Sequence, residues 1–412
     1  MVDLPIDPQR LKYLLDNMAN FGALSGGGIS RRALSEPELA ARQWLTNFAQ
    51  NQQLKVWLDE AANLHFSCNE RIRCETGPVV MTGSHIDSVP EGGVLDGTYG
   101  VLAGIEVLCA LQSAGINTRV PLEVVAFTDE EGRFGGMLGS QAMTGLLDYH
   151  GAAQFTDESG ISVAQAYQPL GLNPQHFAKA RRDLQNIQGF VELHIEQGPR
   201  LENANKTIGV VHGICGLYKI RCRFQGVASH AGTTPMDCRR DALSGATELH
   251  QKLPRLSAPD GVATVGSLRV EPGAPNVIPS TVTFTVDMRH LSLDALNQLK
   301  TDIETTAKDI AQQRGLSFHT EQLSHFSPML CDDEMIATIQ QQAKRLNYST
   351  LAMPSGAAHD ALNFRHAQQV GMIFVPSVGG LSHNTQEYTA FDDLLAGVKV
   401  LSAVLMELTE KS

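Results

Sequence analysis

Histidines and carboxylates gather at five places along the chain, four of them at or just after the end of a predicted buried strand. The fifth follows the last buried strand and its glycine turn. The clusters are His85-Ile86-Asp87, Asp96-Gly97, Asp129-Glu130-Glu131, His194-Ile195-Glu196 and Ser382-His383-Asn384. Imidazoles and carboxylates that converge at one edge of an open α/β sheet are the ligand set of a two-metal hydrolytic site. This mixture suits zinc, manganese, cobalt or nickel better than calcium, which prefers oxygen ligands alone.

Each cluster taken alone also has an ordinary structural explanation. A single histidine after a strand is usually a loop or core residue, Asp96-Gly97 is typical of a turn, and adjacent acids often start a helix. The metal site is favoured only by the concurrence of the clusters, so the residues by themselves leave both interpretations open. Signatures of other chemistry, H-E-x-x-H, G-x-S-x-G and G-x-x-x-x-G-K-[ST], do not occur in the sequence.

The segments that position these clusters alternate between buried strands and helices. Apolar runs predict three buried strands, at 77–87, 120–127 and 189–195. A longer apolar run at about 98–114 predicts a buried helix, and Ser35 with Glu38 resembles a capping box before an earlier one. Strands that alternate with helices indicate an α/β fold with a central, mostly parallel sheet.

The pattern changes near Val211. Apolar and polar residues alternate strictly over 218–225, which predicts a strand with one exposed face. The segments that follow are predicted as a helix at 239–253, strands at 263–270 and 281–289, a helix at 293–313 and a strand at 315–322. These elements predict a small α+β sandwich. We therefore expect one domain formed by residues 1–212 and 327–412, which carries the candidate ligands, and an inserted domain of residues 213–326.

Composition excludes several classes of protein. Of the 412 residues, 44 are acidic and 32 are basic, and the formal charge of −12 speaks against nucleic-acid or anionic-lipid partners. The first residues lack the basic and apolar runs of a signal peptide, and no apolar run is long enough to span a membrane. The seven cysteines form an odd set without C-x-x-C, which is typical of reduced thiols. We expect a cytoplasmic protein with neither nucleic-acid nor membrane partners.

Eight short sequence motifs follow one another along the chain. They are GSHIDSVPEGGVLDG (83–97), TDEEGRF (128–134), ELHIEQGP (192–199), SHAGTTPM (229–236), NVIP (276–279), DMRH (287–290), SGAAHDA (355–361) and SHN (382–384). Together they resemble the hydantoinase/carbamoylase amidases, which include N-carbamoyl-L-amino acid hydrolases, β-ureidopropionases and allantoate amidohydrolases. That family belongs to the wider di-metal superfamily of aminoacylases and carboxypeptidases. The resemblance implies a di-metal catalytic domain with an inserted dimerisation (lid) domain.

The resemblance also implies two divalent metal ions per subunit. One would be held by His85, His194 and the bridging carboxylate of Asp96, and the other by Asp96, Glu131 and His383. A histidine at position 194 resembles the carbamoylase branch, because the peptidase branch of the superfamily typically carries a carboxylate there.

Catalytic roles follow from the same resemblance. Asp87 would orient the imidazole of His85. Glu130 would take a proton from the attacking water and return it to the leaving amine. His230 would donate to the developing oxyanion, either within its own subunit or across a dimer.

The substrate-binding residues are implied in the same way. Arg289 would clamp the substrate carboxylate, Asn276 would bind the same end of the substrate, and Gln197 and His359 would line the pocket. Without the resemblance, a surface salt bridge is the ordinary explanation of Arg289. The family usually has S-G-A-G-H-D-A, and this chain has Ala358 at the second glycine; a positive φ there would cost about 1 kcal/mol or shift His359.

We expect a homodimeric amidohydrolase that cleaves the ureido C–N bond of N-carbamoyl-L-amino acids, or of β-ureido acids, to amino acid, carbon dioxide and ammonia. Its partner molecule would be a small ureido substrate that bears a carboxylate. Allantoate is an alternative, weakened because 216–219 lacks the basic pair of allantoate enzymes. Aminoacylase-like or carboxypeptidase-like hydrolysis is another. A non-catalytic binding protein of the same fold is disfavoured by the intact Glu130 and ligand set.

Overall fold

The computed structural model describes residues 3–68 and 77–410. The chain divides into two compact units. Unit 1 comprises Met1–His212, Cys331–Ser355 and His359–Ser412, and unit 2 comprises Gly213–Leu330 and Gly356–Ala358. The second break lies at 330/331 rather than at 326/327, because the two-residue strand β11 (Met329–Leu330) pairs with the end of β6 and stays with unit 2.

The larger sheet has nine strands. Its order is β1-β2-β4-β3-β5-β13-β6-β11, and β12 pairs with β6. Its other strands are β1 (Lys55–Leu58), β2 (Leu64–Ser67), β3 (Val79–His85), β4 (Leu122–Phe127), β5 (Ile187–Ile195), β6 (Ile208–Ile214), β12 (Thr350–Ser355) and β13 (Val370–Val375). The central strands β4, β3, β5 and β13 are parallel, whereas β1, β2, β6 and β11 pair antiparallel at the two sides. The predicted α/β class and the parallel centre of the sheet are confirmed.

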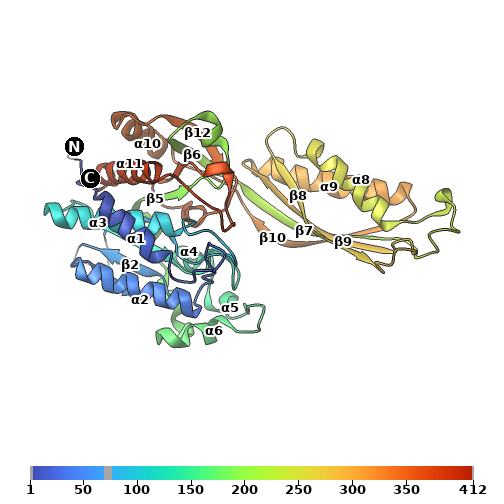
Figure 1. Cartoon of the computed structure of the whole chain (residues 1–412), viewed down its shortest axis with the longest axis horizontal. Coiled ribbons are helices and arrows are strands. Elements are labelled where there is room, and N and C mark those ends of the chain that lie inside the picture. Colours follow the sequence, from blue (N-terminus) through green and yellow to red (C-terminus); the bar gives the residue numbers. More distant parts are fainter. Residues whose placement is uncertain (1–2, 69–76, 411–412) are drawn as a thin grey trace. The chain divides into compact units, whose positions relative to one another are not determined.

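Helices cover the sheet of unit 1 (Figure 1). They are α1 (Pro8–Met18), α2 (Glu36–Asn51), α3 (Thr98–Ala114), α4 (Leu138–Thr144), α5 (Tyr149–Ala152), α6 (Val163–Ala166), α7 (Arg200–Ala204), α10 (Asp333–Arg345) and α11 (Phe391–Glu410). The predicted buried helix is α3, whose residues from Thr98 to Leu111 are buried because the helix lies against β3 and β5 and contacts α1 and α11. The predicted capping box is wrong: Glu38 accepts the N–H of Leu34 at 3.2 Å, and the side chain of Ser35 forms no cap bond.

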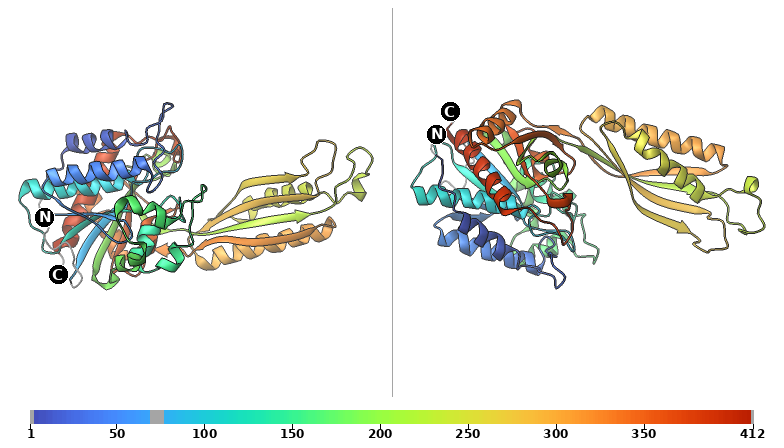
Figure 2. Two further views of the ribbon diagram at one scale, coloured as in Figure 1. Left: turned by 90° about the horizontal axis from the view of Figure 1, so that it is seen from below. Right: turned by 45° about the horizontal axis from the view of Figure 1, so that its top comes forward.

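Unit 2 is an antiparallel sheet of order β10-β7-β9-β8 with two helices along one face (Figure 2). Its elements are β7 (Gly216–Gln225), α8 (Ala242–Leu256), β8 (Val262–Glu271), β9 (Thr281–His290), α9 (Leu293–Gln313) and β10 (Ser317–Phe326). Ile220, Cys222 and Phe224 of β7 are buried in the core that the helices share. The alternating charged residues of β7 are exposed on the other face, as the sequence pattern predicted.

Two smaller predictions concern the whole chain. Within residues 3–68 and 77–410, no helix is both long and apolar enough to cross a membrane. The cysteines in this part of the chain form no disulfide bonds, whereas Cys74 lies outside the described residues.

Candidate metal centre

The carboxyl ends of the central parallel strands bring the predicted clusters together. His85 is the last residue of β3, and His194 is the last but one of β5. The cluster of acids follows β4, and the His383 segment follows β13. Because these strands are parallel neighbours, their carboxyl ends lie at one edge of the sheet. Asp96 reaches this edge from the loop that precedes α3.

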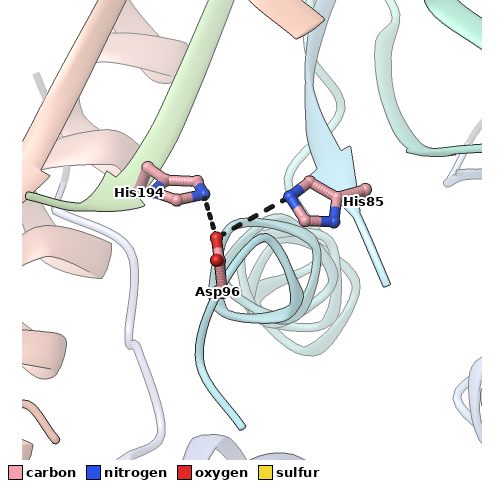
Figure 3. A group of neighbouring side chains, drawn as sticks. All are labelled: His85, Asp96 and His194. Carbon is pink, nitrogen blue, oxygen red and sulfur yellow. Dashed lines mark ion pairs between the residues drawn. The ribbon is translucent and has the colours of Figure 1, made fainter. Parts of the chain in front are cut away.

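His85, Asp96 and His194 form the first group of potential metal ligands (Figure 3). Oδ1 of Asp96 lies 3.1 Å from Nε2 of His194 and 3.8 Å from Nε2 of His85. All three side chains are buried. Figure 3 shows the two imidazoles, from the ends of neighbouring strands, on either side of the Asp96 carboxylate.

Asp96, Glu131 and His383 form the second group. Nε2 of His383 lies 3.2 Å from Oδ2 of Asp96 and 3.4 Å from Oε1 of Glu131. Asp96 therefore belongs to both groups and offers one carboxylate oxygen to each. The side chain of His383 is 52% exposed, whereas that of Glu131 is 9% exposed, so the second group is the more accessible to solvent.

Backbone carbonyl groups orient the rings of His85 and His194. Nδ1 of His85 lies 3.0 Å from the carbonyl oxygen of Asp87, and Nδ1 of His194 lies 2.8 Å from that of Ile195. A carbonyl oxygen can only accept, so each Nδ1 carries a proton and donates it. Each neutral ring then directs the lone pair of Nε2 at Asp96. A lone pair that faces a buried carboxylate requires a positive charge between them, either a proton or a metal ion.

The carboxylates of the site favour a positive charge at the histidine rings. Burial opposes a charged ring at His194, but the hydrogen bond and charge of Asp96 outweigh burial and raise the pKa of His194 to about 9. Hydrogen bonds to Asp96 and Glu131 raise the pKa of His383 to about 10. The N–H of Gly97 lies 3.1 Å from Nε2 of His194 and favours instead the neutral ring, in which Nε2 carries no proton. The carboxylate carries a full charge and therefore dominates over this amide.

The donor set fits divalent metal ions. It combines three imidazole nitrogens with two carboxylates, a mixture that suits zinc, manganese, cobalt or nickel. Oε1 of Glu131 is buried and has no well-aligned hydrogen bond among the described residues. Only the ring of His383 faces it, at 3.4 Å, so this oxygen is available to a cation. The five residues of the two groups are those predicted as ligands from the sequence. The structure brings them together, and their role as ligands stays a prediction.

Glu130 and Asp87 lie beside the first group. Oε2 of Glu130 is 3.6 Å from Nε2 of His85, and burial, followed by the charge of Glu131, raises the pKa of Glu130 well above its usual range. The carboxylate of Asp87 accepts the backbone N–H of Glu131 at 3.1 Å and that of Glu130 at 3.4 Å. Its Oδ1 lies 3.7 Å from Nδ1 of His85. The carbonyl of Asp87 thus orients His85, while its carboxylate positions the two glutamates.

Two buried residues without a predicted role support the site. The carboxylate of Asp129 accepts three consecutive backbone N–H groups of the following loop at 3.1–3.4 Å, which shapes the turn that carries Glu130. Arg31 donates to the carbonyl of Ile86 at 2.7 Å and to the hydroxyl of Thr98 at 2.8 Å. In the sequence, a run of adjacent acids or a pair of arginines gives no sign of which member is buried.

Gln197, predicted to line the substrate pocket, contacts the shared carboxylate. Its Nε2 donates to Oδ2 of Asp96 at 3.0 Å and to Oγ of Ser382 at 3.2 Å. Its Oε1 is buried and has no hydrogen-bond partner in the part of the chain that the structure describes. The side chain thus lies beside the candidate ligands, with one acceptor oxygen left for a bound molecule.

His359 lies beside the first group as well. The edge of its ring packs against His194, with 4.5 Å between the centroids, and its Nε2 is 3.0 Å from Oγ of Ser355. Ala358 is not among the described residues with a positive φ. The strain considered for alanine at this position is therefore absent, and the alanine gives no reason for His359 to shift.

The three predicted residues of unit 2 do not lie together. A β-bridge and a backbone hydrogen bond join the segments that carry His230 and Asn276, at the end of the sheet where β9 begins at Thr281. Arg289 pairs with Leu217 near the other end of β9. The eight residue-to-residue steps from Thr281 to Arg289 span roughly 26 Å. One small substrate cannot contact all three side chains of a single chain, so the prediction that Asn276 and Arg289 bind the same end of a substrate fails within one subunit.

Arg289 and His230 each have defined partners. The guanidinium of Arg289 donates to Oδ1 of Asp287 at 3.0 Å and to the carbonyl of Gly356 at 2.8 Å, so the ion pair given above as its ordinary explanation is formed. The backbone N–H groups of the second and third residues after His230 donate to its Nδ1, at 3.0 and 3.2 Å. The neutral ring of His230 therefore carries its proton on Nε2, which makes it a donor.

Known proteins share both the sequence and the fold. Residues 81–407 match the peptidase family M20/M25/M40. The crystal structure of an amidase of the hydantoinase/carbamoylase family from Burkholderia multivorans superposes with a TM-score of 0.90 and 35% identity, covering 100% of this chain and 99% of that one. The chain belongs to the hydantoinase/carbamoylase family. It is therefore an amidohydrolase, a hydrolase of C–N bonds, with candidate sites for divalent metal.

Relatives of this chain are named for different substrates. An N-carbamoyl-L-amino acid amidohydrolase of Geobacillus stearothermophilus is 38% identical over 98% of this chain and 99% of that protein. An allantoate amidohydrolase of Bacillus subtilis is 34% identical over 95% of each chain. Since the two identities are close, overall similarity does not separate these substrates.

Proposed function

We propose that this protein hydrolyses the ureido C–N bond of N-carbamoyl-L-amino acids in a two-metal site. The observation that carries the proposal is the shared carboxylate of Asp96, which faces an imidazole of each ligand group, at 3.1 Å from His194 and 3.2 Å from His383. A carboxylate in this position can bridge two divalent ions. The choice of substrate rests on residues 216–219, which lack the basic pair expected of allantoate enzymes. It agrees with the name of the relative from Geobacillus stearothermophilus, which is 38% identical along nearly the whole chain.

Glu130 is the proposed proton carrier. Divalent ions in the two groups would supply the Lewis acidity that makes a water molecule nucleophilic near neutral pH. Glu130 would take one proton from that water as its oxygen bonds to the ureido carbon, and would pass the proton to the nitrogen that leaves when the C–N bond breaks. Burial among other acids raises the pKa of Glu130, which helps it to hold a proton between these two steps.

A homodimer would complete the site. Because His230 and Asn276 lie at the end of the unit 2 sheet remote from Arg289, we propose that they serve the site of the partner subunit. His230 would then donate its Nε2 proton to the oxyanion, and Arg289 would exchange Asp287 for the substrate carboxylate.

A panel of substrates tests the proposal. Purified protein is stripped with chelator, supplied with zinc, manganese, cobalt or nickel, and assayed for ammonia release from N-carbamoyl-L-amino acids, β-ureidopropionate and allantoate. Release of amine from N-formyl and N-acetyl amino acids is measured in parallel. The proposal predicts metal-dependent turnover that is fastest on N-carbamoyl-L-amino acids. Allantoate as the fastest substrate would move the assignment to the function named in the relative from Bacillus subtilis, and activity that resists the chelator would refute the metal mechanism.

A further inference from the structure

Glu387 joins two loops that carry members of both ligand groups. It lies between β13 and α11, and it is buried. Its Oε1 accepts the backbone N–H of Leu95 at 3.0 Å and that of Asp96 at 3.1 Å, and its Oε2 accepts the hydroxyl of Ser382 at 2.8 Å. One carboxylate therefore ties the backbone of Asp96 to the residue next to His383, although these segments are nearly 300 residues apart in sequence.

Ser382 extends this connection to the shared carboxylate. Its hydroxyl lies 3.4 Å from Oδ2 of Asp96, and it receives a hydrogen bond from Gln197 at 3.2 Å. The backbone N–H of Glu387 also donates to the carbonyl of Asn384 at 3.0 Å, which closes a turn over residues 384–387, directly after His383. Both the backbone and the side chain of Glu387 thus shape the short segment that presents His383.

The side chain of Glu387 fits only because residue 93 is a glycine. A Cβ at Gly93 would lie 2.0 Å from Oε1 of Glu387. Any larger residue at position 93 would displace the carboxylate from the N–H groups of Leu95 and Asp96. This close approach provides a way to move Glu387 without replacing it.

The two ligand groups depend on Glu387 to different degrees. His85 and His194 stand on strands, and the ring of each is held by a backbone carbonyl. His383 stands on a loop at a φ of 52°, is half exposed, and directs its Nε2 at Asp96 and Glu131. The second group therefore relies more on the loop contacts that Glu387 makes.

We infer that Glu387 is a positioning residue that fixes Asp96 and His383 relative to each other and thereby sets metal affinity in the second group, Asp96–Glu131–His383. The inference rests on the proposed two-metal site. When the hydrogen bonds of Glu387 are removed, the second group should lose its metal ion before the first group does. Glu387 would have this effect without being a ligand itself.

Three variants and one control test this role. Glu387→Ala removes all three hydrogen bonds, Gly93→Ala displaces the carboxylate, and Glu387→Gln keeps an oxygen for the two N–H groups while its amide turns to Ser382. The control is Glu202→Ala, because the exposed Glu202 accepts the N–H of Gly379 at 2.9 Å in the same loop segment but contacts no candidate ligand. Two readouts are measured: bound metal after dialysis against graded free metal, and amide hydrogen exchange over 90–97 and 381–389 in metal-free protein.

Wild type and Glu202→Ala should bind two ions per chain. Glu387→Ala and Gly93→Ala should keep one ion and lose about 10–100-fold in affinity for the other, with faster exchange in both peptides. Glu387→Gln should lie between them. Activity of Glu387→Ala should recover at saturating metal, which general loss of stability would not produce.

Several results would overturn the inference. Glu387→Ala that binds both ions as wild type does, or that loses both equally, contradicts it. Should Glu387→Ala fail to fold, Glu387→Gln and Gly93→Ala decide in its place, and wild-type metal binding in both refutes the role. Failure of the proposed function gives a different result. If wild-type protein binds no metal while amide exchange is faster in Glu387→Ala, the two-metal site is rejected and the positioning role of Glu387 is retained.

Discussion

Glu130 and Glu131 are adjacent in the chain, yet their carboxylates face different partners. Oε1 of Glu131 faces His383 in the second ligand group, and Oε2 of Glu130 faces His85. The carboxylate of Asp87 accepts the N–H groups of both and fixes this divergence. A carboxylate bound to a metal ion is a much weaker base than a free one, so in the proposed mechanism these adjacent residues divide the two tasks.

Glu130→Gln tests this division. The amide keeps the shape of the side chain but cannot take a proton, so kcat should fall by about 10²- to 10⁴-fold while bound metal is unchanged. Glu131→Gln is the matched control and should lose metal from the second group. Elemental analysis and steady-state kinetics on the same preparations measure both effects. A loss of metal in Glu130→Gln would make Glu130 a ligand instead of the base.

At the scale of elements, the start of α3 is built around the ring of His85. Gly97 precedes the helix at a φ of 61°, and a Cβ there would lie 2.3 Å from Nε2 of His85. The turn that carries Asp96 can approach β3 this closely only because residue 97 has no side chain. The geometry of the first ligand group thus depends on how one helix begins.

Gly97→Ala should destabilise the fold by about 1–3 kcal/mol and weaken metal binding in the first group. Gly115→Ala is the control at the other end of the same helix, where φ is 63° and no atom lies within 4 Å of the added Cβ. This control should show the backbone strain without any change in metal affinity. Urea unfolding and metal titration distinguish the two variants, and equal metal binding in both would show that His85 tolerates the methyl group.

A buried ion pair network at β2 and β4 gives a pH dependence. Burial opposes a charge on His65, but its hydrogen bonds to Asp59 and Glu123 outweigh burial and raise its pKa to about 9. The folded protein therefore holds this proton more tightly than the unfolded chain, in which the pKa is about 6.5. The stabilisation is fully present below that lower value and is lost as the pH rises through the folded pKa.

The free energy of unfolding of the wild type should thus fall between about pH 6.5 and 9 relative to that of His65→Gln, by up to about 3 kcal/mol. Urea denaturation of both proteins across this range measures the difference, which removes the contribution of other titrating groups. Parallel pH profiles would show that His65 is neutral in the folded protein.

At the scale of the whole molecule, the position of the proposed substrate-binding residues bears on assembly. His230 and Asn276 lie at one end of the unit 2 sheet and Arg289 near the other. If a second subunit supplies His230, two inactive variants can complement each other. A heterodimer of His230→Ala and Glu130→Gln then contains one site with both residues intact.

Mixing these variants under conditions of subunit exchange should restore up to about a quarter of wild-type activity, because half of randomly formed dimers are heterodimers and each has one complete site. Ammonia release before and after mixing measures this, with each variant alone as the baseline. Exchange is verified by native mass spectrometry of tagged chains. Verified exchange without recovered activity would place His230 in the site of its own subunit.

The sequence by itself was sufficient for the α/β class, the buried helix α3 and the exposed face of β7. These predictions were correct because each depends on local patterns, namely apolar runs and alternation. The sequence also placed five candidate ligands at or near the ends of strands, and their role as ligands stays a prediction. Parallel strands then bring those ends together without further information. The sequence misled at Ser35, where the expected side-chain hydrogen bond does not form. The absence of strain at Ala358 and the separation of Asn276 from Arg289 within one subunit depended on backbone angles and on distances across a sheet.

Only the tertiary structure decided which side chains support the ligands. Three sets of hydrogen bonds join segments that are far apart in the chain. They are formed by the carboxylate of Glu387, by the amide of Gln197 with Asp96, and by the buried guanidinium of Arg31. Such hydrogen bonds form because packing excludes water and leaves a buried donor or acceptor one partner within reach. Residue type and spacing carry no record of that partner. The candidate ligands could therefore be predicted from the sequence, whereas the hydrogen bonds that position them became visible only in the folded chain.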